Sequence, residues 1–70
     1  MLLSISDLEL ATKHLLNDEF IVVAEYVEGV RNKSIKYNAF TKKYKVSTDV
    51  SGTLLESTNL SAIVKMYNSI

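Results

Sequence analysis

The spacing of hydrophobic residues changes twice along this chain, from a helical pattern to an alternating one and back again. Near the start, Leu8 and Ala11 belong to an apolar stripe with three- and four-residue spacing, and Ser6 followed by Glu9 forms a capping-box pattern. This pattern predicts a helix from Asp7 to Leu16.

Residues 19–28 are rich in β-branched and aromatic side chains, so they predict a strand whose two faces are both largely apolar. Such a strand belongs in the middle of a sheet or at an interface between subunits, because an exposed apolar edge favours aggregation. The polar Arg31-Asn32-Lys33 that follows predicts a turn or a short loop.

Polar and apolar residues alternate again over residues 35–48, which predicts an antiparallel hairpin. If Tyr37 lies opposite Tyr44 on the buried face, then Lys36 lies opposite Lys45 on the other face. The loop between the two strands carries Phe40 at its tip.

A turn at residues 49–52, a short strand at 53–56 and a final helix with Asn59 as its N-cap complete the pattern. One face of that helix is apolar and comprises Leu60, Ile63, Val64, Tyr67 and Ile70. We therefore predict a single α+β domain over residues 1–70, with a three- or four-stranded antiparallel sheet flanked by an N-terminal and a C-terminal helix.

Composition adds two expectations. A chain of 70 residues buries only about 60% of its unfolded surface, and it has no cysteine to form a disulfide. Its hydrophobic content of 47% favours an apolar surface covered by a second copy or by a partner. Because oligomerisation is a common way to stabilise so small a domain, we predict a homodimer built on the strand at 19–28. With no secretory signal and no apolar run near the ~20 residues of a membrane helix, a cytoplasmic protein is expected.

Residues suited to catalysis are few. His14 is interpreted as a cation near a helix C-terminus, and Asp18 with Glu19 as a solvated turn. The sequence has no glycine-rich phosphate loop and no metal-ligand spacing. We therefore predict a non-enzymatic binding protein without a cofactor or a metal.

Charge segregation is the main functional signal. The chain has 8 basic and 8 acidic residues, yet residues 31–45 contain six basic residues and no acidic one. Lysines directly opposite each other destabilise a hairpin, so we expect an external anion, such as DNA or RNA, to neutralise them. The predicted contact residues are Arg31, Lys33, Lys36, Lys42, Lys43 and Lys45, with Phe40 as a stacking or anchoring residue.

Three alternatives stay open. The basic hairpin is also consistent with a solvated face that keeps sheet edges soluble. The acidic remainder of the chain can instead mimic nucleic acid in the basic channel of a host protein, through Asp7, Asp18, Glu19, Glu25 and Glu28. A purely structural homo-oligomer is the third.

Four segments between Ile35 and Asn68 form a basic-aromatic pattern: Ile35-Lys36-Tyr37-Asn38, Lys42-Lys43-Tyr44-Lys45-Val46, Ser51-Gly52, and Ala62 with Val64-Lys65-Met66-Tyr67-Asn68. This layout resembles the three-strand-plus-helix DNA-binding modules of the AP2 type and of integrase arm-binding domains. The resemblance implies that the sheet lies in the major groove, with Lys36, Lys43 and Lys45 as contacts. In general type, the small neutral chain also resembles accessory proteins of phages and mobile elements, which often block a host protein.

Overall fold

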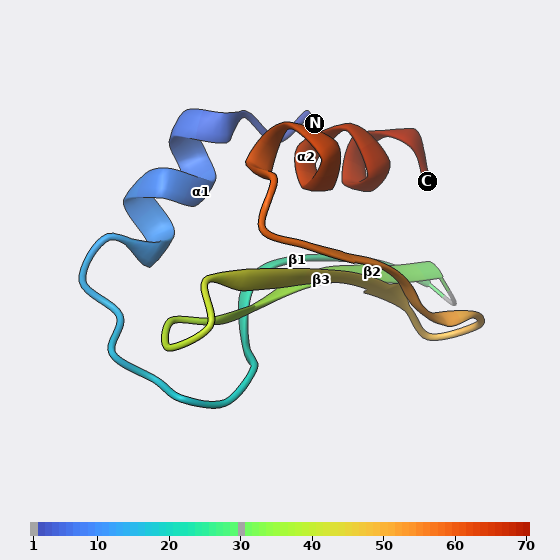
Figure 1. Cartoon of the computed structure of the whole chain (residues 1–70). Coiled ribbons are helices and arrows are strands. Elements are labelled where there is room, and N and C mark those ends of the chain that lie inside the picture. Colours follow the sequence, from blue (N-terminus) through green and yellow to red (C-terminus); the bar gives the residue numbers. More distant parts are fainter. Residues whose placement is uncertain (1, 30) are drawn as a thin grey trace.

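Two helices and a four-stranded antiparallel sheet make up residues 2–29 and 31–70, which a computed structural model describes, for Arg31 the backbone alone. The elements are α1 (Ile5–Thr12), β1 (Ile21–Glu28), β2 (Arg31–Asn38), β3 (Lys43–Thr48), β4 (Gly52–Ser57) and α2 (Leu60–Ser69). The strands lie side by side in chain order, and both helices pack on the same side of the sheet (Figure 1). The predicted α+β class and the flanking helices are confirmed.

The register between β2 and β3 is the predicted one. Tyr37 pairs with Tyr44 and Lys36 with Lys45. The two tyrosine rings lie on the helix side with their centroids 4.5 Å apart, and both residues are only 5% exposed. Because side chains alternate along a strand, this register directs the two lysines to the face opposite the helices.

The core lies between the helices and the inner face of the sheet. Its buried apolar residues are Leu8, Ile35, Tyr37, Ala39, Tyr44, Val46, Ile63, Val64 and Tyr67. Burial raises the pKa of both Tyr44 and Tyr67, so these phenols stay protonated to a higher pH than exposed tyrosines do. The buried residues of α2 belong to its predicted apolar face, while Ile70, just after the helix, is 44% exposed.

The first helix begins two residues earlier than predicted and is shorter. Its N-cap is Ser4: Asp7 N–H donates to Ser4 Oγ (3.2 Å), and Ser4 N–H donates to the Asp7 carboxylate (3.1 Å). An amide pair fixes this start, because Leu3 N–H donates to Asn68 Oδ1 (2.9 Å) and Asn68 Nδ2 donates to Leu3 O (2.8 Å). Ser6 is therefore inside the helix, and the prediction that it is the cap is wrong.

The apolar strand β1 is an edge strand, so of its two predicted places the middle of the sheet is excluded, and an interface between subunits stays a prediction. Each strand is followed by an antiparallel neighbour, so the first strand of the chain remains at the edge. The polar segment 31–33, predicted as a loop, forms the start of β2. Gly29 has a φ of 59°, a conformation that permits a tight turn directly after β1.

Candidate functional site

Three of the predicted contact lysines extend from the side of the sheet that faces away from both helices, which we call the open face. Lys36 comes from β2, and Lys43 and Lys45 come from β3. Each alternates with buried residues of the core, so the pattern that builds the hydrophobic layer also places these three lysines on one face of the sheet.

A groove of about 340 Å³ crosses the open face. The groove runs from Lys36 and Lys45 to the β3–β4 turn, and hydroxyl groups make up most of its lining between them. Two of these hydroxyls, Ser34 Oγ and Ser47 Oγ, lie 3.2 Å apart across the β2–β3 pair. The lining residues of the groove are Phe20, Ser34, Lys36, Lys45, Ser47, Thr48, Asp49, Gly52 and Thr53. We call this feature the open-face groove.

Phe20 is a site residue that the sequence analysis missed. It precedes β1, and Lys45 Nζ lies 4.0 Å from the centroid of its ring. The segment before it is anchored by Asn17 Nδ2, which donates to Glu19 O (2.6 Å) and to Tyr37 O (2.7 Å). The strand pattern placed Phe20 inside β1, and no local signal predicts its contact with a lysine of β3.

Glu56 partly neutralises the basic cluster. Its carboxylate lies 3.6 Å from Lys43 Nζ and 3.7 Å from Lys45 Nζ, because β4 brings it opposite Lys45. Segment 31–45 itself has no acidic residue, but Glu56, from outside that segment, supplies a counter-charge to both lysines of β3. Among the residues that the structure describes, Lys36 forms no ion pair and is the least compensated cation of the cluster.

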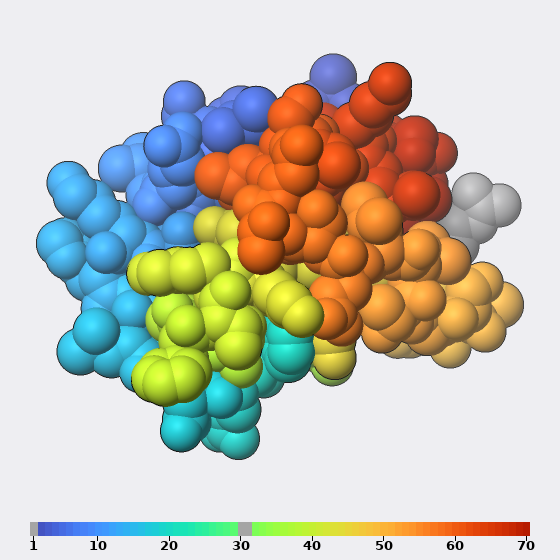
Figure 2. All heavy atoms as spheres, in the orientation of Figure 1, coloured from blue at the N-terminus to red at the C-terminus, as the bar shows by residue number. Residues whose placement is uncertain are grey.

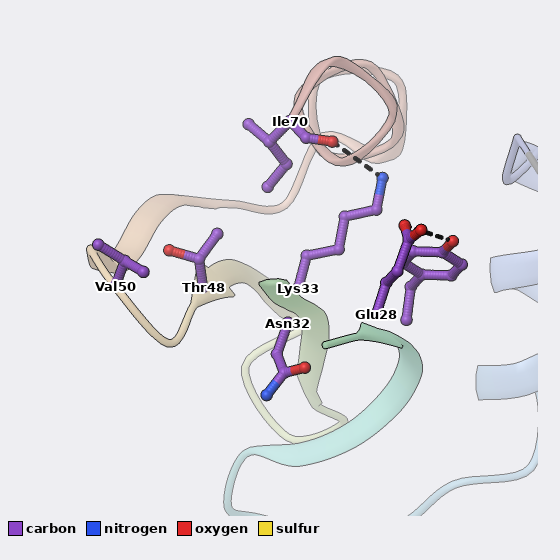
Figure 3. Close-up of a pocket in the computed structure, with 7 residues that line it drawn as sticks. Glu28, Asn32, Lys33, Thr48, Val50 and Ile70 are labelled. Atoms are coloured by element: carbon purple, nitrogen blue, oxygen red, sulfur yellow. Dashed lines mark hydrogen bonds between the residues drawn. The ribbon is translucent and has the colours of Figure 1, made fainter. Parts of the chain in front are cut away.

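Lys33 lies on the opposite side of the sheet from the other lysines. Its Nζ donates to Tyr67 O (2.8 Å) and Ile70 O (3.2 Å), and it lies 4.4 Å from the centroid of the Tyr67 ring. Figure 3 shows this side chain reaching the end of α2 along a second pocket of about 350 Å³. The helix end thus satisfies its charge, and Lys33 does not belong to the open face.

The β2–β3 turn adds two exposed candidates. Phe40 is 82% exposed, so it extends into solvent instead of folding back over the sheet. Lys42 has a φ of 63°, a left-handed conformation that is uncommon for a residue with a side chain.

This turn is braced from within. Asn38 Oδ1 accepts from Phe40 N–H (2.9 Å) and Thr41 N–H (3.1 Å), and Asn38 Nδ2 donates to Asp18 O (2.9 Å). Figure 2 shows the turn side by side with the segment that carries Asp18. The hydrogen bonds of Asn38 therefore fix the backbone from which the exposed Phe40 side chain extends.

The five acidic residues proposed for protein mimicry come from three segments: α1, the loop before β1, and β1 itself. Two of them are engaged internally. The Asp7 carboxylate caps α1, and the Glu28 carboxylate accepts from Tyr26 Oη (2.9 Å), which raises the pKa of Tyr26. Asp18, Glu19 and Glu25 remain exposed.

Three further observations concern Arg31, the helices and the comparison with known proteins. The side chain of Arg31, a predicted contact, lies outside the described residues. Within residues 2–29 and 31–70, no helix has the length and apolar character needed to cross a membrane. Comparisons with protein-family models, curated proteins and solved structures found no match to this chain.

Proposed function

We propose that this protein binds nucleic acid through the open face of its sheet. The observation that carries the proposal is the cross-strand pair Lys36–Lys45 on that face. Like charges directly opposite each other destabilise an antiparallel pair by some tenths of a kcal/mol, and a bound phosphate would offset this repulsion. Hydroxyl groups beside the pair supply further donors for phosphate or sugar oxygens.

Lys43 and Lys45 contribute to the same surface despite their contact with Glu56. Surface ion pairs are worth only about 0–1 kcal/mol, so exchanging a shared carboxylate for a phosphate costs little. At the turn, Lys42 extends the cationic surface and Phe40 offers an exposed ring for stacking.

The test compares two double variants with equal changes in charge. Lys36→Gln with Lys45→Gln removes the cross-strand pair. The helix variant, Lys13→Gln with Lys65→Gln, instead removes two exposed lysines, one at the C-cap of α1 and one in α2. Affinity for labelled DNA and RNA is measured by fluorescence anisotropy between about 50 and about 200 mM salt. We expect wild-type affinity to fall about 20- to 40-fold over this range, as about three phosphate contacts predict.

The open-face variant should bind at least about tenfold more weakly at low salt and show a shallower salt dependence, since two contacts are lost. The helix variant should match the wild type. Absence of binding at low salt, or equal loss in both variants, would contradict the proposal.

We also propose that two copies associate through β1. This edge strand exposes 49% of Val22, 44% of Tyr26 and 60% of Val27. Antiparallel pairing of two β1 strands about a twofold axis perpendicular to the sheet would keep both open faces on one side. Such a dimer doubles the cationic surface, and its mass in solution tests the proposal.

A further inference from the structure

We infer that the nucleic acid is single-stranded and that the open-face groove receives one of its nucleotides, with the base on Phe20. This inference rests on the proposed function and names its ligand. The first observation is shape: the open face is hollowed between Phe20 and the β3–β4 turn. The major groove of a duplex accepts elements that project into it, such as a helix or a β-ribbon, which a hollow face cannot supply.

The volume and the lining fit the same ligand. Ligand sites have volumes of about 300–1,000 Å³, and this groove, at about 340 Å³, is at the small end of that range. It has room for one nucleotide and none for a duplex. Lys36 and Lys45 provide cations for the phosphate, while the hydroxyls of Ser34, Ser47 and Thr53 can bond to a sugar or a base edge.

Phe20 supplies the aromatic surface on which single-stranded bases stack. In the unbound protein, the Lys45 ammonium lies over this ring. A phosphate that pairs with Lys45 draws the ammonium away and exposes the ring to the adjacent base. The hydrogen bonds of Asn17 hold the preceding segment against β2, so the ring is positioned before the ligand arrives.

The experiment uses a single-stranded oligonucleotide of about 16 nucleotides, together with its duplex, as competitors for a labelled single strand. We expect the single strand to compete at least about tenfold better than the duplex. Phe20→Leu keeps an apolar side chain but removes the stacking surface, and it should weaken single-strand binding about fivefold or more. Leu10→Ala is the control, because Leu10 is an exposed apolar residue of α1, away from the open face and from β1. It should leave affinity unchanged.

A second measurement needs no variant. Titration of the wild-type protein with the single strand should shift the ring resonances of Phe20 and the side-chain resonances of Lys36 and Lys45, and leave those of Lys33 in place. Equal or tighter binding of the duplex, or unshifted Phe20 resonances in the saturated complex, would overturn the single-strand inference and leave the proposed function standing. Binding of neither competitor would overturn the proposed function itself.

Discussion

Lys33 and Lys36 are three residues apart in β2, and this odd spacing puts them on opposite faces of the sheet. Lys36 is exposed on the open face, whereas Lys33 donates to the last carbonyls of α2 and lies over Tyr67. The two residues have the same charge, but one stabilises the fold and the other is available to a ligand. At the scale of single residues, the face of the strand on which a lysine lies decides whether it stabilises the fold or is exposed to a ligand.

Lys33→Met and Lys36→Met separate these roles. Lys33→Met keeps an apolar stem but removes the ammonium from the end of α2, so it should lower the free energy of unfolding by about 1–2 kcal/mol. It should leave nucleic-acid affinity unchanged. Lys36→Met should weaken nucleic-acid binding and change stability little, because an opposing like charge is removed. Urea unfolding and anisotropy on both variants check this, and weakened binding by Lys33→Met would contradict the assignment.

At the scale of elements, α1 shows how two overlapping capping patterns are resolved. Ser4 with Asp7 and Ser6 with Glu9 both place a serine three residues before a carboxylate, and both are compatible with Leu8 on the buried side. The structure selects Ser4, whose neighbour Leu3 is tied to α2 through Asn68. A contact between residues 65 positions apart therefore determines where a local pattern begins.

Alanine substitutions of the two serines test this helix start. Ser4→Ala removes the acceptor for the Asp7 N–H and should destabilise the protein by about 1 kcal/mol. Ser6→Ala, at an exposed position within the helix, should change stability by less than about 0.5 kcal/mol. Thermal unfolding followed by circular dichroism measures both effects. A larger loss in Ser6→Ala than in Ser4→Ala would place the cap where the sequence pattern predicted it.

The elements also show what the sequence could predict. The hairpin was predicted to its register because alternation and the two facing tyrosines are local signals. The sequence left a central and an interface position open for β1, because the choice depends on how the strands are connected. Phe20 and Glu56 were missed as neighbours of Lys45 because pairing of distant segments brings them there. The register of the hairpin was therefore predictable from the sequence, but the residues from distant segments that contact its lysines were not.

At the scale of the whole molecule, the fold distributes the charged residues of one sequence segment over several separate surfaces. The basic segment 31–45 divides between the open face, the turn and the end of α2. The edge strand β1 carries Glu25 and Glu28 and no basic residue. Like charges would therefore meet when two copies pair through β1, and salt should affect the two proposed interactions in opposite directions.

Sedimentation measurements at several protein concentrations test the β1 dimer. Dimerisation should strengthen with salt, because screening reduces repulsion between the glutamates of the two strands, whereas nucleic-acid affinity should fall. Val27→Lys places a charge on the edge and should shift the protein to a monomer. Val50→Lys, in the exposed β3–β4 turn, is the control and should leave the mass unchanged. A monomeric wild type at all concentrations would contradict the dimer.

The placement of both helices on one side of the sheet has an evolutionary consequence. Along β2 and β3, buried core residues alternate with residues that face outward. The two sets lie on opposite faces of the sheet, so their side chains do not pack against each other. Substitutions on the open face can therefore accumulate with little loss of stability, while the inner positions stay under strong selection. A lineage of such proteins could change its ligand rapidly while keeping its architecture.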